Sequence, residues 1–193
     1  MNVNLAQAEE ASVAPVRSAS SLEFEVLWRG LKKESGLIPN RREFKPEKAR
    51  SLLRDLVLVE ARLGEPPSFP IRLVGSGAQQ RIQQNIVGHD YLDFLPPELH
   101  AGAIESGRLM FNHPCGLWQV MTMHYAREYA QNVEITAFPL LADANSVPLL
   151  LVLMQPVKGL VSAIQAQGRP ILVDTASVFE FIDIGAGSPP WPV

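Results

Sequence analysis

The spacing of apolar residues divides the first part of the chain into a helix, a hairpin and a helical segment. Apolar side chains recur every three or four positions over residues 21–36, which predicts an amphipathic helix. Two apolar runs, 56–61 and 69–74, flank a cluster of turn residues and predict a pair of strands. Between residues 75 and 113, helix-breaking glycine and proline residues separate short segments with a helical pattern.

Three long extended runs follow, at residues 116–127, 132–141 and 148–157, and their short connections favour antiparallel neighbours. The first of these runs is partly apolar at both odd and even positions, and the last is apolar at successive positions. The apolar side chains on both faces of such a sheet must be shielded from water by other elements. We expect helices on one face, and the N-terminal helix or a second copy of the chain on the other.

The same pattern predicts four parts: a flexible leader (1–20), the amphipathic helix (21–36), one main domain (37–160), and a C-terminal extension with a mobile tail (161–193). A length of 193 residues suits a single compact domain. No apolar run reaches the roughly 20 residues that a membrane-spanning helix needs, and the first twenty residues lack the pattern of a secretory signal. We therefore expect a cytoplasmic protein without membrane insertion.

Four local segments stand out along this order of elements: Pro39-Asn-Arg-Arg-Glu-Phe-Lys-Pro46, Leu52-Leu53, Phe69-Pro-Ile-Arg-Leu-Val-Gly75 and Gly88-His-Asp-Tyr-Leu-Asp-Phe94. Together with the order of the elements, these segments resemble a PAS sensory domain. The similarity is to a divergent PAS-like family of small bacterial proteins, and it covers residues 22–157. The resemblance implies an α+β fold, with a five-stranded antiparallel sheet, short helices on one face and an N-terminal amphipathic helix. It also implies room for a small-molecule cavity and a role in signal transduction.

Five residues of these segments are expected to be structural. Gly75 and Gly88 stand where an extended run meets a helix, and each would supply a backbone conformation that a Cβ resists. Arg41 and Arg72 would hold loop carbonyls or carboxylates such as Asp93, and so tie the proline-bounded loop to the sheet. Binding of an anionic ligand is the alternative role for the two arginines.

The candidate ligand-binding residues come from two places. By resemblance, His89, Tyr91 and Phe94 of the helical segment border the cavity. On the strand that follows, Met121, Met123 and Tyr125 share one face, and methionine either fills a core or lines an adaptable pocket. No cofactor is identified.

Haem would need an axial ligand such as His89 or His113. The helical segment lacks the cysteine that the light-sensing PAS branch carries there, so flavin photochemistry is not expected.

Neither a metal site nor a catalytic site is predicted. His113, Cys115 and His124 match no closed zinc spacing. On a strand Cys115 and His124 would point to opposite faces, which also disfavours a nucleophilic pair.

Nine of the 17 basic residues lie between Arg29 and Arg54, against three acidic ones, but they are spread over two helices and a loop. This distribution favours solvated helix faces over a nucleic-acid surface.

Together these features predict a stand-alone PAS-like sensory or regulatory domain, not an enzyme, that acts through a protein partner and is modulated by a small molecule. We also expect a homodimer in which the helix residues Phe24, Trp28 and Leu31 of two copies meet. The alternative is a small α+β enzyme or carrier with an apolar substrate in its cavity and His124 or His89 as general base. A structural dimer with a filled core is a third hypothesis.

Overall fold

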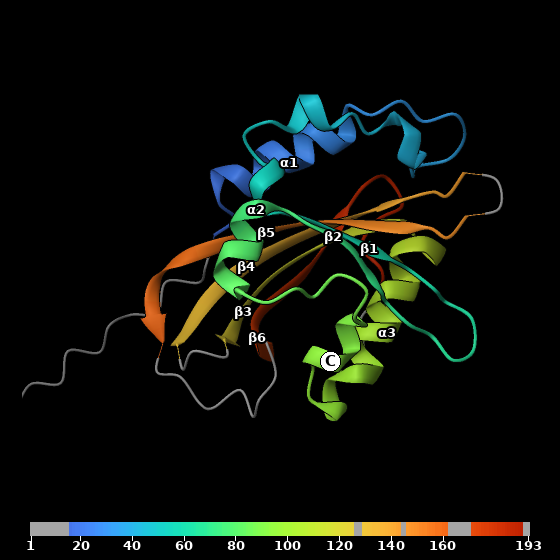
Figure 1. Cartoon of the computed structure of the whole chain (residues 1–193). Coiled ribbons are helices and arrows are strands. Elements are labelled where there is room, and N and C mark those ends of the chain that lie inside the picture. Colours follow the sequence, from blue (N-terminus) through green and yellow to red (C-terminus); the bar gives the residue numbers. More distant parts are fainter. Residues whose placement is uncertain (1–15, 126–128, 144–145, 162–170, 191–193) are drawn as a thin grey trace, which may run out of the picture.

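A single antiparallel sheet of six strands forms the centre of the molecule, with helices on both of its faces (Figure 1). The structure is a computed structural model, which describes residues 16–125, 129–143, 146–161 and 171–190. The strand order across the sheet is β2-β1-β5-β4-β3-β6. The strands are β1 (Leu56–Glu60), β2 (Ile71–Val74), β3 (Cys115–Tyr125), β4 (Tyr129–Leu140), β5 (Leu149–Val161) and β6 (Ile171–Asp183).

Three α-helices and four short 3-10 helices complete the described part of the chain. Their order confirms the predicted layout of a helix, a hairpin, a helical segment and three antiparallel strands. The α-helices are α1 (Ala19–Arg29), α2 (Ser76–Ile82) and α3 (Pro97–Asn112), and the 3-10 helices are η1 (Arg41–Glu43), η2 (Pro46–Ala49), η3 (Leu53–Asp55) and η4 (Tyr91–Phe94).

The prediction of five strands is wrong, because β6 extends the sheet along the free edge of β3. The sequence pattern assigned residues 161–193 to a C-terminal extension, since residues 174–177 include polar and small side chains that break the apolar run of 171–173. The backbone of β3 has unpaired N–H and C=O groups on that side, and a strand of mixed composition can satisfy them. The pairing contains register shifts near Met121.

Helix α1 begins earlier and ends earlier than predicted. Ser18 is the N-cap, and its side chain accepts a hydrogen bond from the backbone N–H of Ser21 at 3.1 Å. The helix ends at Arg29 and Gly30 caps it, so the segment 31–36 is not helical. Of the expected leader, residues 1–15 lie outside the described residues, while residues 19 and 20 belong to α1.

The sheet has a core on each of its faces, as the apolar positions of both parities predicted. On β3, Leu117 and Met121 pack with the helical segment that follows β2, whereas Trp118 and Val120 pack with α1. Strand β5 alternates in the same way, because successive side chains of a strand point to opposite faces. Each face is therefore covered by elements of the same chain.

Helix α1 packs on its own sheet, which corrects the predicted dimer interface. The side chains of Phe24 and Trp28 are 0% exposed and that of Leu31 is 7% exposed. The Trp28 ring stacks on Phe138 of β4 at a centroid distance of 4.9 Å, and its Nε1 donates to the carbonyl of Pro139 at 3.0 Å. Phe24, Trp28 and Leu31 are core residues of the protomer, so they do not form an interface between copies.

Hydrogen bonds between buried polar groups fix the position of α1 along β4. Glu134 is 4% exposed, and its Oε1 accepts from the backbone N–H of Ser18 at 2.9 Å and from Nε1 of Trp118 at 2.7 Å. The hydroxyls of Ser21 and Thr136 lie 2.7 Å apart and share a hydrogen bond. A carboxylate next to the first turn of a helix also interacts favourably with the helix dipole. These hydrogen bonds give α1 a definite position that apolar contact alone would not specify.

None of the helices in the described ranges is long and apolar enough to cross a bilayer.

Replacement of Trp28 by Ala should lower the free energy of unfolding by about 3 to 5 kcal/mol, because it removes a fully buried ring and leaves a cavity above Phe138. Val26 lies on the same helix and is 71% exposed, so Val26→Ala should change the free energy of unfolding by less than about 0.5 kcal/mol. Urea denaturation measures both values. Equal effects of the two substitutions would show that α1 does not pack on the sheet in this orientation.

Candidate functional site

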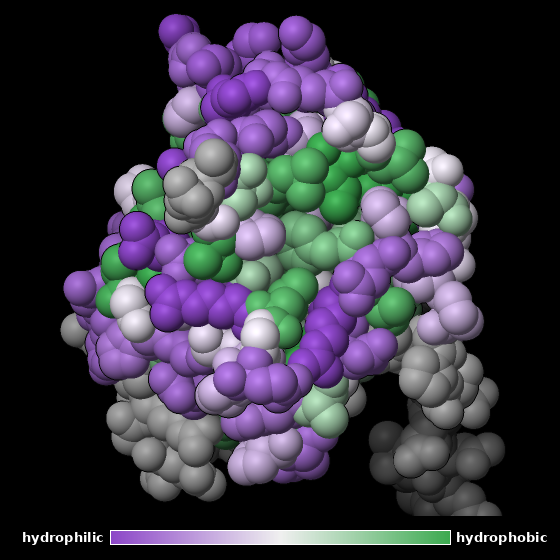
Figure 2. Space-filling view, turned by 90° about the vertical axis from the view of Figure 1, so that its right-hand side faces the viewer, coloured by the Kyte–Doolittle hydropathy of each residue, from purple (hydrophilic) through white to green (hydrophobic). Residues whose placement is uncertain are grey.

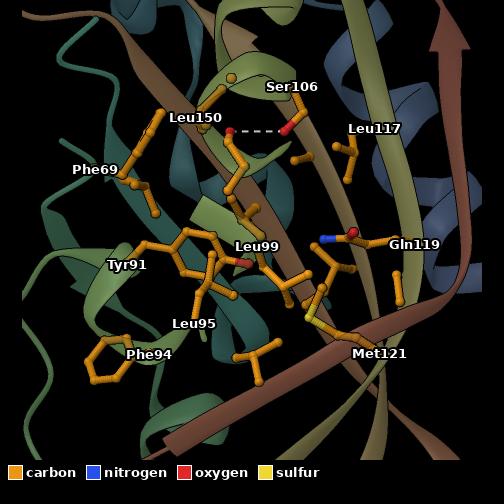
Figure 3. A pocket seen from close by; sticks show the side chains of 18 of the residues that line it. Phe69, Tyr91, Phe94, Leu95, Leu99, Ser106, Leu117, Gln119, Met121 and Leu150 are labelled. Carbon is orange, nitrogen blue, oxygen red and sulfur yellow. Dashed lines mark hydrogen bonds between the residues drawn. The ribbon is translucent and has the colours of Figure 1, made fainter. Parts of the chain in front are cut away.

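A pocket of about 440 Å³ lies between the sheet and the helical segment formed by η4 and α3 (Figure 3). This volume falls within the range of roughly 300 to 1,000 Å³ that is common for small-molecule sites. All six strands contribute to the wall on the sheet side. The pocket occupies the face of the sheet opposite α1.

The wall on the sheet side is almost entirely apolar. Leu117, Met121 and Met123 on β3 are joined by Leu150 and Met154 on β5, all of which point to the same face. The alternation of strand residues puts these side chains into the pocket and their neighbours into the core beneath α1. The pocket thus has a surface of branched, sulfur-containing and aromatic side chains, typical of sites that bind apolar molecules.

Helix α3 faces this wall with several small residues. Gly102, Ala103 and Gly107 all line the pocket. A Cβ at Gly107 would lie 2.7 Å from the ring of Phe69, so glycine there lets α3 approach that ring closely. A Cβ at Gly102 would have no atom within 4 Å of it. Gly102 thus leaves space beside it, whereas larger α3 residues such as Leu99 and Met110 also line the pocket.

Few polar side chains interrupt the apolar surface. Ser106 donates its hydroxyl to the carbonyl of Ala103 within α3, at 3.0 Å (Figure 3). Gln119 points from β3 toward the middle of the pocket in the same view. The polar residues that line the pocket are Tyr91, Glu98, Ser106, Gln119 and Asp174.

The Tyr91 hydroxyl lies in an environment that opposes its ionisation. Desolvation by burial raises the pKa of Tyr91 to about 12, from an ordinary value of 10.0. The phenol is therefore a neutral group at physiological pH, able to donate or accept one hydrogen bond toward the pocket.

Four of the six predicted ligand-binding residues line the pocket, namely Tyr91, Phe94, Met121 and Met123. The other two do not line it. His89 is exposed, and its ring centroid lies 6.0 Å from that of Phe94. Tyr125 is buried in the core on the pocket side, and its hydroxyl donates to Sδ of Met123 at 3.8 Å. Binding of a ligand to these residues stays a prediction.

The sequence-based prediction missed Gln119 and the whole face of α3. Gln119 had a usable signal, since it is the one amide among the odd positions of β3. The small residues of α3 had no comparable signal, because glycine and alanine in an amphipathic helix do not reveal what lies opposite them.

The two motif glycines are required for different reasons. Gly88 has a φ of 91°, a conformation that residues with a Cβ rarely adopt, as expected. Gly75 has an ordinary φ of −65°, which corrects the expectation of an unusual backbone conformation. Its constraint is close approach, since a Cβ would lie 2.4 Å from the carbonyl oxygen of Leu53.

Arg41 does tie the proline-bounded loop to the sheet, but not through Asp93. Its Nε lies 2.7 Å from Oδ2 of Asp143, beyond the end of β4, and its backbone N–H donates to the carbonyl of Leu141. Arg72 pairs with Glu60 on the neighbouring strand at 3.2 Å. Both arginines hold carboxylates, as expected of structural residues.

The reactive side chains noted in the sequence do not converge. Cys115 is buried, and desolvation raises the pKa of its thiol to about 12. His124 is buried with its Nε2 3.7 Å from Oδ2 of Asp174, while Nε2 of His113 lies 3.1 Å from the carbonyl of Gly187. Within the described ranges, no three His, Cys, Asp or Glu side chains are placed to hold a metal ion.

Comparison with known proteins shows similarity among solved structures alone. No family model matches the sequence, and no curated protein matches it. Among solved structures, a LOV protein of Rhodobacter sphaeroides is similar, with a TM-score of 0.43 and 16% sequence identity. The match covers 58% of this chain and 66% of the LOV protein's chain, just under two thirds of its length.

The fold is a curled antiparallel sheet with few helices. It carries six strands in the described residues, one more than the five that the PAS resemblance implied.

The pKa of Tyr91 predicts a specific dependence of stability on pH. The folded state holds the phenol proton more tightly than the unfolded state, so the stabilisation is complete below pH 10 and is lost as the pH rises toward about 12. Tyr91→Phe should show a smaller decrease in the free energy of unfolding over this interval. Chemical denaturation at several pH values tests it, and an identical pH dependence in both proteins would place the phenol in water instead.

Proposed function

We propose that this protein is a PAS-like sensory domain of bacterial signal transduction, which binds a small molecule in the pocket beneath α3 and acts on a regulatory protein partner. The observation that carries the proposal is the pocket of about 440 Å³, lined by apolar side chains from all six strands and α3. The proposal includes a homodimer.

The contrast between the two faces of the sheet supports a binding role for the pocket. Against α1 the core is filled, with the side chains of Trp28, Phe24 and Phe138 in mutual contact. Against α3 the equivalent space is left open. Unfilled volume in a core costs stability, by about 24 cal/mol per Å³ where a side chain has been removed. A ligand that binds the folded state recovers stability by mass action.

The position of α3 offers a physical route from ligand to partner. Helix α3 contacts β3 and β4, and η4 contacts β6, so the pocket lies between elements that are far apart in the sequence. A ligand alters the protein only if it binds two conformations unequally. A molecule that fits between α3 and the sheet favours one distance between the helix and the sheet. A protein partner that contacts α3 would bind the conformations with different distances unequally.

The enzyme alternative has less support from the geometry. Neither His89 nor His124, the two proposed general bases, is among the residues that line the pocket. Tyr91, which does line it, has a raised pKa and holds its proton at neutral pH. Geometry comes first in the assignment of a general base, and here it favours binding over proton transfer.

Native mass spectrometry of the freshly purified protein tests the proposal together with a variant that fills the pocket. Gly102→Trp places a large ring where a Cβ has open space, and Gly102→Ala is the matched control that leaves most of the volume free. Replacement of glycine within a helix is favourable for helix formation in both variants, which protects the fold.

The wild-type protein and Gly102→Ala should carry a defined extra mass, or gain one on incubation with a cell extract, and Gly102→Trp should not. The spectrum should also show the mass of a dimer. Retention of the same extra mass by Gly102→Trp would place the ligand elsewhere and contradict the proposal.

A further inference from the structure

We propose that the pocket selects an uncharged, largely apolar molecule with one hydrogen-bonding group, and that it discriminates against anions. This inference rests on the proposed function, because it assigns the class of ligand for the same pocket.

The charges around the pocket carry the first part of the inference. Among the described residues that line it, Glu98 and Asp174 carry carboxylates, and none is Lys, Arg or His. The nearby α3 residue Arg108 is paired with Glu65 at 2.8 Å. Asp174 lies 3.7 Å from Nε2 of His124, which leaves the Glu98 carboxylate as the charge to consider. An anion in the pocket would leave water for an apolar environment without a cation among the lining residues to compensate, and Glu98 would repel it.

The second argument for this ligand class is the apolar wall of the pocket. Phosphate and carboxylate groups of ligands are usually held by basic side chains or by several backbone N–H groups. The residues in view in Figure 3 instead surround the space with aliphatic, aromatic and sulfur-containing side chains. Nucleotides, phosphate esters and free fatty acids are therefore poor candidates for this pocket.

The third argument is the side chain of Gln119, which can form a hydrogen bond with a ligand. Its amide lies on the floor of the pocket, between Leu117 and Met121 on the same face of β3 (Figure 3). Within the described part of the chain the side-chain amide makes no hydrogen bond, so both its donor and its acceptor are available. A neutral amide pairs well with a carbonyl, hydroxyl or amine of a ligand. A polar group of this kind fixes orientation in an otherwise apolar site.

Two fluorescent probes with the same aromatic skeleton test the charge preference directly. N-phenyl-1-naphthylamine is uncharged at neutral pH, and 8-anilinonaphthalene-1-sulfonate carries one additional sulfonate. Both gain fluorescence in an apolar environment. Binding within the pocket is defined as the part of the signal that Gly102→Trp removes and Gly102→Ala retains.

For this part of the signal, the uncharged probe should bind at least about tenfold more tightly than the sulfonate, a difference of about 1.4 kcal/mol. Gln119→Leu should weaken binding of the uncharged probe several-fold without improving that of the sulfonate. Gln119→Lys should reverse the preference, because it supplies the missing cation. Where Gln119→Lys does not fold, Glu98→Gln replaces it and should narrow the difference in affinity between the two probes.

The outcomes separate this inference from the proposed function. Equal or tighter binding of the sulfonate in the pocket would overturn the ligand class and leave a ligand-binding sensor in place. Absence of any pocket signal for both probes would overturn both the ligand class and the proposed function. A preference for the uncharged probe that is lost in Gln119→Lys would support both.

Discussion

Because the central strands of the sheet are apolar on both of their faces, the rest of the structure has to cover both of them. Side chains of β3 and β5 alternate between the two cores, so neither face can remain in water at low cost. Helix α1 covers one face, and η4 and α3 cover the other. Figure 2 shows how apolar side chains also reach the surface of the molecule, in a hollow bordered by hydrophilic ones.

The two covers differ in the size of the side chains that they bring to the sheet. Helix α1 brings Phe24 and Trp28, which fill the space above Phe138, and a buried carboxylate at Glu134 fixes its position. Helix α3 brings the small residues Gly102, Ala103 and Gly107 to the pocket, beside Leu99 and Met110. The smaller side chains on α3 leave part of the space above the sheet open, whereas the larger side chains of α1 fill the space on the opposite face.

The order of the helices and strands can be predicted from the periodicity of the sequence. Which elements pack against one another cannot. The order of helix, hairpin, helical segment and three strands is visible in the sequence, because each element repeats with its own period. The pattern around Trp28 shows that a helix must be buried, but the same pattern would arise against a second copy of the chain. Strand β6 was missed because its pairing with β3, rather than its own polar and small residues, makes it extended. Gln119 became a candidate only when α3 was seen opposite it.

The measurement that tests the account most directly is a crystal structure of the protein under xenon pressure. Xenon occupies apolar cavities without needing a specific hydrogen bond. The account predicts xenon density between α3 and the sheet, in contact with Met121 and Leu99, and none between α1 and the sheet. A helix α3 packed closely onto β3, with no xenon in between, would contradict the central claim that this face of the sheet is left open for a ligand.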